Sequence, residues 1–253
     1  MEVVRVHIHA PVVSFRHPFF VVGRQPTSLM PPPSTIHGLC AAALGAWPVP
    51  GEFCFGVHFT FASRGNDLEH QHITSPMGAK TRTMVQTSDG PRQATTEINV
   101  QPTSRDFLFD THLTLYIPPR VGEAFRHPRF TMTLGRSQDR AEILSVERVE
   151  LEKGNRVRLD HTLLPMAVRP CVRFGIPVLL SRHIAEPPER DAKFAQYICL
   201  HEPVFLGDGV DSTRAFIRHA TIPLDDLWCD TSITDDEGFC RGVWIHRLVE
   251  DER

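Results

Sequence analysis

The most informative segment of this chain reads Pro26-Thr27-Ser28-Leu29-Met30-Pro31-Pro32-Pro33-Ser34-Thr35-Ile36-His37-Gly38-Leu39-Cys40-Ala41-Ala42-Ala43-Leu44-Gly45-Ala46-Trp47. Prolines cannot continue a helix, and each one biases the preceding residue toward an extended conformation. After the three prolines, Ser34 is predicted to be the N-cap of a helix. Apolar side chains recur at helical spacing from Ile36 to Trp47, and Pro48 ends the run. The segment therefore predicts an extended arm followed by an amphipathic helix.

The start of this helix has two interpretations. Free amides and the helix dipole favour an anion such as a phosphate at a helix N-terminus. The simpler interpretation is an ordinary helix start after a proline-rich lead-in, which spacing alone favours. A second stripe of small residues, Gly38, Ala41 and Gly45, would let another backbone approach the helix closely.

Two motifs resemble those of a known family. The first is Pro31-Pro32-Pro33-Ser34-Thr35-Ile36-His37-Gly38-Leu39, preceded by Ala10-Pro11-Val12-Val13-Ser14-Phe15-Arg16, and the second is Leu134-Gly135-Arg136-Ser137. In this order they are similar to the motifs of the Cas-five family of CRISPR-associated proteins. The resemblance covers about residues 3–150 and is faint beyond them.

The resemblance implies a function. Family members cap the 5′ end of the guide RNA in type I Cascade complexes of antiviral defence. It therefore implies a non-catalytic RNA-binding subunit that binds the 5′ handle of the CRISPR RNA (crRNA). Its implied partners are the Cascade backbone subunits, the large subunit that senses the protospacer-adjacent motif (PAM), and target DNA near the PAM.

Composition sets broad limits on function. The chain of 253 residues is long enough to bury a substantial core, and its net charge of −3 argues against a general basic nucleic-acid binder. The charge is unevenly divided: residues 1–140 hold 13 Lys and Arg against 10 Asp and Glu, whereas residues 141–253 hold 14 against 20. All but three of the 27 basic residues are arginine, which suits phosphate and stacked-base contacts, although high genomic GC content would give the same bias.

Targeting and cysteine patterns indicate the compartment. No run of eighteen apolar residues and no signal-peptide pattern occur, so we expect a cytoplasmic protein with no membrane contact. The six cysteines include no C-x-x-C pair and are predicted to be reduced, mostly buried thiols.

The first strand is predicted over residues 3–9. Val4, Val6 and Ile8 alternate with Arg5, His7 and His9, which indicates a half-buried strand with a polar open face. The histidines belong either to a solvated sheet face or to a surface on which RNA or a partner lies. A His-x-His pair can also bind a metal ion, but no third ligand is evident, so we predict no metal site and no cofactor.

The further elements suggest a fold class. Strands are predicted over residues 52–61, 107–117, 130–134 and 141–151, with a short helix over 122–127. This order, with one long insertion, matches a ferredoxin-like domain, the fold of the RNA-recognition module (RRM). The fold class expected is α+β: a ferredoxin-like (RRM-like) domain over residues 1–152 and a β-rich C-terminal extension over 153–253 packed on it.

The insertion, about residues 64–106, is polar and rich in Thr and Gln. It contains the turn Ser88-Asp89-Gly90-Pro91 between two β-prone pieces, residues 80–87 and 93–100, and so predicts a protruding β-hairpin. In the family an insertion here is the thumb, which lies across the guide RNA. A mobile solvated loop is the alternative.

Catalysis is not expected from the motifs. The phosphate-binding, dinucleotide-binding and nucleophile-elbow patterns are all missing. One branch of the family cleaves precursor crRNA without metal through a Tyr, a Lys and a His, and this chain lacks that pattern near its helix. A metal-independent endoribonuclease built from other histidines is therefore one alternative, and a stand-alone RRM-like protein is another.

The candidate RNA-binding residues combine the family motifs with charge and loop position. Amides at residues 34–38 and several side chains would contact phosphates or handle bases. The predicted RNA-binding residues are Arg16, Arg24, Ser34, Thr35, His37, Gly38, Lys80, Arg82, Arg92, Arg105 and Arg136, and no residue is assigned to catalysis.

Overall fold

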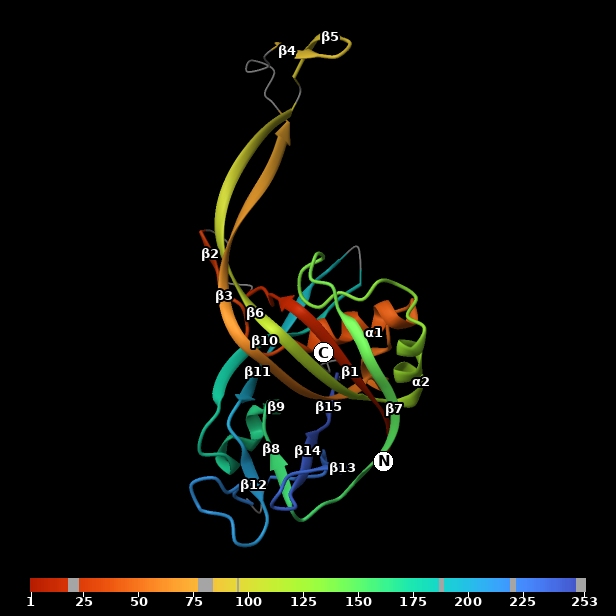
Figure 1. Cartoon of the computed structure of the whole chain (residues 1–253), viewed down its shortest axis with the longest axis vertical. Coiled ribbons are helices and arrows are strands. Elements are labelled where there is room, and N and C mark those ends of the chain that lie inside the picture. The colour runs from red at the N-terminus through yellow and green to blue at the C-terminus, as the bar shows by residue number, and fades with distance from the viewer. Residues whose placement is uncertain (18–22, 77–83, 95, 187–188, 219–221, 249–253) are drawn as a thin grey trace.

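The computed structural model describes residues 1–253 except 18–22, 77–83, 95, 187–188, 219–221 and 249–253. The protein is mixed α/β and rich in strand, and a large sheet extends from its body into one long hairpin (Figure 1). None of the helices in the described part of the chain is long and apolar enough to span a membrane.

Four strands form the centre of the large sheet. In spatial order they are β7 (Glu142–Glu152), β1 (Glu2–Val13), β6 (Thr96–Ile117) and β3 (Cys54–Pro76), each antiparallel to its neighbour. The alternation predicted for β1 is confirmed, because Val4, Val6 and Ile8 are fully buried while Arg5, His7 and His9 are only partly buried.

Helix α1 (Pro33–Leu44) covers one face of these strands. Ile36, Leu39, Cys40 and Ala43 pack with the buried side chains of β1 in the main core. The predicted N-cap was wrong: Pro32 is the N-cap, because the fixed φ of Pro33 suits the first helical position.

The helix also ends earlier than the apolar spacing predicted. Gly45 has a φ of 80° and donates its N–H to the carbonyl of Ala41 at 2.8 Å, which closes the last turn. Trp47 therefore lies outside the helix and is 39% exposed.

The strand predicted over residues 130–134 is absent from this fully described segment. Arg129 and Phe130 instead donate backbone N–H groups to Ala43 and Ala42, at 2.9 and 3.0 Å. The start of the segment thus bonds to the end of α1, and Thr133 forms only an isolated bridge with Arg140. The predicted short helix is confirmed as α2 (Pro119–Gly122) followed by the 3-10 turn η2 (Glu123–Arg126).

The long hairpin is built from β3 and β6, which stay paired from Gly56–Tyr116 out to Pro76–Thr96. At about 3.3 Å per residue, the part of β3 beyond Arg64 reaches roughly 40 Å from the body. A small hairpin of β4 (Met84–Thr87) and β5 (Gly90–Gln93) forms the tip (Figure 1). The prediction of a protruding hairpin is confirmed, although its arms begin much nearer the body than residues 80 and 100.

The C-terminal part of the chain is also rich in strand. β13 continues the main sheet beside β7, and β15 pairs with β3 at the opposite edge. A separate sheet has the order β10-β11-β9, and β10 contacts the start of α1. The remaining elements are β2 (Arg24–Gln25), η1 (Pro50–Glu52), β8 (Val157–Leu159), β9 (Thr162–Pro165), η3 (Met166–Cys171), β10 (Ile176–Ile184), β11 (Ala192–Leu200), β12 (Val204–Leu206), β13 (Leu227–Thr234), β14 (Cys240–Trp244) and β15 (His246–Arg247).

The prediction of six reduced cysteines is corrected at one place. Cys229 and Cys240, on the paired strands β13 and β14, are joined as a disulfide with Cα atoms 5.9 Å apart. Cys40, Cys171 and Cys199 are free and buried, as predicted.

Candidate functional site

The face of the central strands opposite α1 carries a group of polar side chains. On β1 and β6, His7 lies opposite Thr114 and His9 opposite His112. On the other side of β6, strand β3 places His58 opposite Thr114 and Thr60 opposite His112. We call this surface the histidine face, and its members are Arg5, His7, His9, His58, Thr60, His112 and Thr114.

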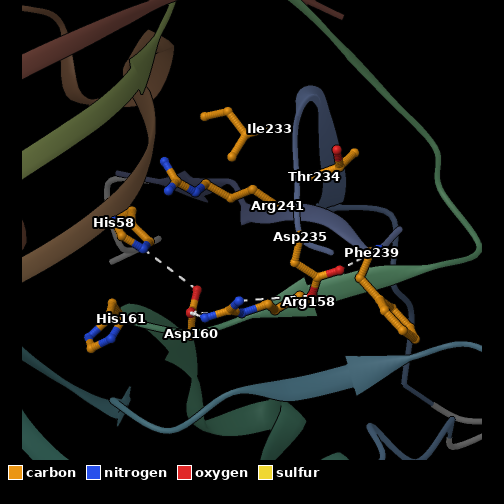
Figure 2. Close-up of a pocket in the computed structure, with 9 residues that line it drawn as sticks. All are labelled: His58, Arg158, Asp160, His161, Ile233, Thr234, Asp235, Phe239 and Arg241. Atoms are coloured by element: carbon orange, nitrogen blue, oxygen red, sulfur yellow. Dashed lines mark hydrogen bonds and ion pairs between the residues drawn. The ribbon is translucent and has the colours of Figure 1, made fainter. Parts of the chain in front are cut away.

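Two adjoining cavities lie along the histidine face. One of about 380 Å³ is lined by Arg5, His7, His58 and His112 among others. A second of about 260 Å³ shares the residues His58, Ile233 and Arg241 with the first. Ile233 and Arg241 come from β13 and β14, so the C-terminal part of the chain closes one side of the surface. The other residues lining the second cavity are Arg158, Asp160, His161, Thr234, Asp235 and Phe239 (Figure 2).

Asp160 is the central charge of the second cavity. Figure 2 shows its carboxylate between His58 and Arg158, with an Arg158 Nη2–Asp160 Oδ2 distance of 2.5 Å and a His58 Nε2–Asp160 Oδ1 distance of 3.6 Å. Burial alone would raise the pKa of Asp160, but the contacts with His58 and Arg158 lower it to about 2. Asp160 is therefore ionised at neutral pH.

The histidines beside it are neutral at pH 7. Burial lowers the pKa of His58 and of His161, and together with the positive charge of Arg241 it outweighs the opposing effect of the Asp160 carboxylate. Burial also lowers the pKa of His7, with added repulsion from His112 and Arg241. A neutral imidazole both donates and accepts hydrogen bonds. With Arg241, the surface can thus contact bases, 2′-hydroxyls and phosphates.

A compact cluster lies at the end of the histidine face nearest the hairpin. His9 Nε2 is 3.0 Å from Asp110 Oδ1, and His112 Nε2 is 3.7 Å from the same oxygen. Strand pairing places β6 beside β1, and so brings Asp110 and His112 next to His9. The sequence alone did not reveal that a third side chain able to bind a metal ion lies beside the histidines. Asp110 and His112 both stood on the polar side of the predicted strand, and only the pairing shows that they meet His9.

Arg16 and Arg24, predicted to bind phosphate, lie near the base of the hairpin. Arg16 is exposed and forms an isolated bridge with Thr27. The Arg24 side chain is 69% exposed and lies 3.3 Å from Asp106. Both arginines present their charge at the surface, as a phosphate contact requires.

Arg105 and Arg136, also predicted to bind phosphate, are held in a buried ion-pair network. Arg105 Nε donates to Glu69 at 2.5 Å, and Arg136 pairs with both Glu69 and Asp139. Their side chains are only 9% and 13% exposed. Glu69 and Asp139 already neutralise these two arginines, so the structure does not favour the predicted phosphate contacts.

The structure does not favour the predicted contacts at the start of α1 either. The amides of Thr35 and Ile36 donate to Pro32 O at 2.8 and 3.2 Å, and proline at position 33 has no N–H, so few donors remain for an anion. The Ser34 hydroxyl lies 2.5 Å from that of Ser181 on β10.

His37 cannot read a base, because it is 2% exposed and its Nε2 lies 2.8 Å from Pro48 O. Thr35 and Gly38 are half-buried on α1, away from the histidine face. In the hairpin, Arg92 is exposed on β5 and pairs with Asp89 at 3.1 Å. Lys80 and Arg82 lie outside the described residues.

The fold and the histidine face define a mixed α/β protein with an open polar sheet surface beside a projecting hairpin. The family model described as CRISPR-associated protein (Cas_Cas5) matches residues 3–174. The chain belongs to this CRISPR-associated family. No curated protein matches its sequence.

Several solved structures are similar to this chain at low identity. A chain of a "CRISPR RNA-guided surveillance complex" is 17% identical with a TM-score of 0.48, over 85% of this chain and 95% of that one. A CRISPR protein from Archaeoglobus fulgidus is 12% identical with a TM-score of 0.44, over 98% and 100% of the two chains. A chain of the type III-B Cmr-beta complex bound to cognate target RNA and AMPPnP is 10% identical with a TM-score of 0.43, over 79% and 86%.

Proposed function

We propose that this protein is a non-catalytic, cytoplasmic RNA-binding subunit of a type I Cascade complex that binds the 5′ handle of the crRNA. Membership of the CRISPR-associated family supports this role. The observation that carries it is that β3 and β6 form both the histidine face and the projecting hairpin. A strand of RNA lying on the face would therefore meet the hairpin where it leaves the body.

The fold supports the same assignment. The spatial order β7-β1-β6-β3, with α1 between β1 and β3 in the chain, is the order expected of a ferredoxin-like domain. In RRM domains of this fold the open sheet face binds single-stranded RNA. The histidine face is the corresponding surface here.

The chemistry of the surface suits single-stranded RNA. Neutral His7 and His58 can exchange hydrogen bonds with base edges and 2′-hydroxyls, while Arg241 can contact a phosphate. The acidic second half of the chain and the hairpin would contact the Cascade backbone subunits and the large PAM-sensing subunit, near target DNA.

The direct test measures binding of fluorescently labelled handle RNA by anisotropy. Arg241→Ala should weaken binding by about fivefold to tenfold, the effect of one phosphate contact. Arg120→Ala removes an equal charge from α2, where the side chain is 90% exposed, and should leave affinity unchanged. Equal effects of the two substitutions would refute the proposed surface.

A second test concerns the hairpin. Ile73 and Asn99 are cross-strand partners, so joining them through an Asn-Gly turn removes the outer hairpin without cutting the sheet. The shortened chain should keep its circular dichroism spectrum and lose affinity for handle RNA. Full affinity in the shortened chain would exclude the hairpin from the binding site.

One observation favours the alternative of a metal-independent endoribonuclease. The rings of His58 and His161 lie 5.5 Å apart, beside Asp160, Arg158 and Arg241. Two imidazoles can act as general base and general acid in RNA cleavage. Incubating the chain with repeat RNA and a chelator tests this alternative. A single cut that is lost in both His58→Ala and His161→Ala would replace the non-catalytic proposal.

A further inference from the structure

Three side chains of types that can bind a metal ion lie close together on the histidine face. They are not among the residues that line both cavities. The ligand atoms of His9, Asp110 and His112 all lie within 4.8 Å of one another. Their side chains are 26%, 49% and 40% exposed, so the cluster is open to an incoming ion.

The backbone explains why the three residues meet. His9 and His112 are cross-strand partners, and Asp110 lies two residues before His112 on the same strand face. The pairing of β1 with β6 passes from Ala10–Thr111 to Val12–Phe109, with no pairing for Pro11 or Asp110.

Asp110 also has an unusual conformation. Its φ is 52°, in the left-handed region that non-glycine residues adopt uncommonly. Such a conformation persists only where the surrounding structure holds it. Here it accompanies a half-exposed carboxylate that lies against His9.

We propose that His9, Asp110 and His112 form a binding site for a divalent transition-metal ion of the zinc class. Zinc binds imidazole nitrogen and carboxylate oxygen at about 2.0–2.2 Å, which gives ligand-to-ligand separations of about 3.4 Å in a tetrahedron. The separations of 3.0 Å and 3.7 Å from Asp110 Oδ1 lie on either side of that value. Two imidazoles suit zinc, whereas magnesium and calcium prefer oxygen ligands alone.

His7 acts as a positioning residue for this site. Its Nε2 lies 3.3 Å from Nδ1 of His112, so the two rings share a hydrogen bond. That bond occupies Nδ1 of His112 and leaves Nε2, the atom facing Asp110, to bind the ion. Three protein ligands leave at least one coordination position for water or an anionic oxygen.

The test uses the full chain without a histidine tag, stripped of metal with a chelator. We expect one Co²⁺ ion per chain to bind with visible d–d absorption bands, and one equivalent of Zn²⁺ to displace it. His9→Ala, His112→Ala and Asp110→Asn should each abolish the bands or weaken binding at least 100-fold. His7→Ala should weaken it about tenfold, the usual effect of losing a partner of a ligating histidine.

His127→Ala is the matched control, because His127 is an exposed histidine at the end of η2 and not on the strands that carry the cluster. It should bind Co²⁺ like the natural protein. Circular dichroism of each metal-free variant checks that the fold is intact. Absence of the bands in the natural protein, or their persistence in His9→Ala, would overturn the proposal and leave His9 and Asp110 as a simple hydrogen-bonded pair.

Discussion

The carboxylate of Asp139 accepts a hydrogen bond from the backbone N–H of Ser14, with Oδ2 and N 3.1 Å apart. The same oxygen accepts the backbone N–H of Arg136 at 3.1 Å, and the carboxylate pairs with the Arg136 guanidinium. Ser14 belongs to the Ser-Phe-Arg run and Arg136 to the Leu-Gly-Arg-Ser motif. The two family motifs therefore meet at one buried carboxylate, and Arg136 links them to Glu69 in the hairpin.

Asp139→Ala should lower the free energy of unfolding by about 3–5 kcal/mol, because it leaves two backbone donors without their acceptor and removes one of the two carboxylates that pair with the buried Arg136 guanidinium. Urea unfolding followed by circular dichroism measures the change. Asp236→Ala removes an exposed carboxylate from a turn and should change stability by less than about 0.5 kcal/mol. Similar losses in the two variants would show that the Asp139 contacts contribute little.

Gly135→Ala should destabilise the protein more than Gly209→Ala does. Both glycines have positive φ, 99° and 77°, so both substitutions introduce backbone strain. At Gly135 the new methyl group would also lie 2.7 Å from the carbonyl oxygen of Ser14, whereas nothing lies within 4 Å at Gly209. We expect the additional loss at Gly135 to be about 1–3 kcal/mol, measured by thermal unfolding. Equal melting temperatures would argue against the close approach of the two motifs.

Stability should fall as the pH decreases from about 6.5 toward 4. Burial lowers the pKa of His246 to about 4, and its Nε2 lies 3.0 Å from Leu163 O. In the unfolded chain the pKa is near 6.5, so within this window the unfolded state binds a proton that the folded state excludes. His246 alone should cost up to about 3 kcal/mol at the acid end. His246→Gln keeps a hydrogen-bond donor without titrating, so its free energy of unfolding should depend less steeply on pH; an unchanged slope would contradict this assignment.

Arg24→Ala and Arg136→Ala should have different effects, although the sequence predicted a phosphate contact for both. Arg24→Ala removes an exposed charge, so it should weaken RNA binding and reduce the slope of log K against log salt by about 0.7. Arg136→Ala should instead lower the melting temperature, because it removes the arginine that pairs with Asp139 and leaves Glu69 with Arg105 as its remaining buried partner. Anisotropy titrations at several salt concentrations and a thermal melt separate the two effects. A reduced salt slope for Arg136→Ala, with stability unchanged, would restore its predicted role.

The local sequence pattern was sufficient to predict a helix or strand where one face of that element is buried. The alternation in β1 and the apolar spacing of α1 identified both elements, because each presents one side to the core. The outer hairpin lacks any such pattern, since side chains such as Leu68 and Val100 are exposed there. Its strands were therefore predicted only around the Asp-Gly turn.

The candidate site was harder to predict, because its members meet only through strand pairing. His9 gave a signal within its own strand, but His112 lies 103 residues further along and was assigned no role. The pairing of Arg136 with Glu69 could not be predicted for the same reason, because Glu69 lies on β3, 67 residues away in the sequence. The charge and loop position of an arginine in one sequence do not show whether its side chain is exposed to a ligand or already paired with a carboxylate.

The hairpin has a mechanical consequence. β3 and β6 run from the body as far as Pro76 and Thr96 as continuous strands, so this described part of the hairpin contains no loop that could act as a hinge. We expect a displacement imposed near Pro76 and Thr96 to be transmitted along the backbone hydrogen bonds of this ladder toward His58 and Thr114. A neighbouring molecule that binds the outer part of the hairpin should therefore also tilt the sheet surface at its base.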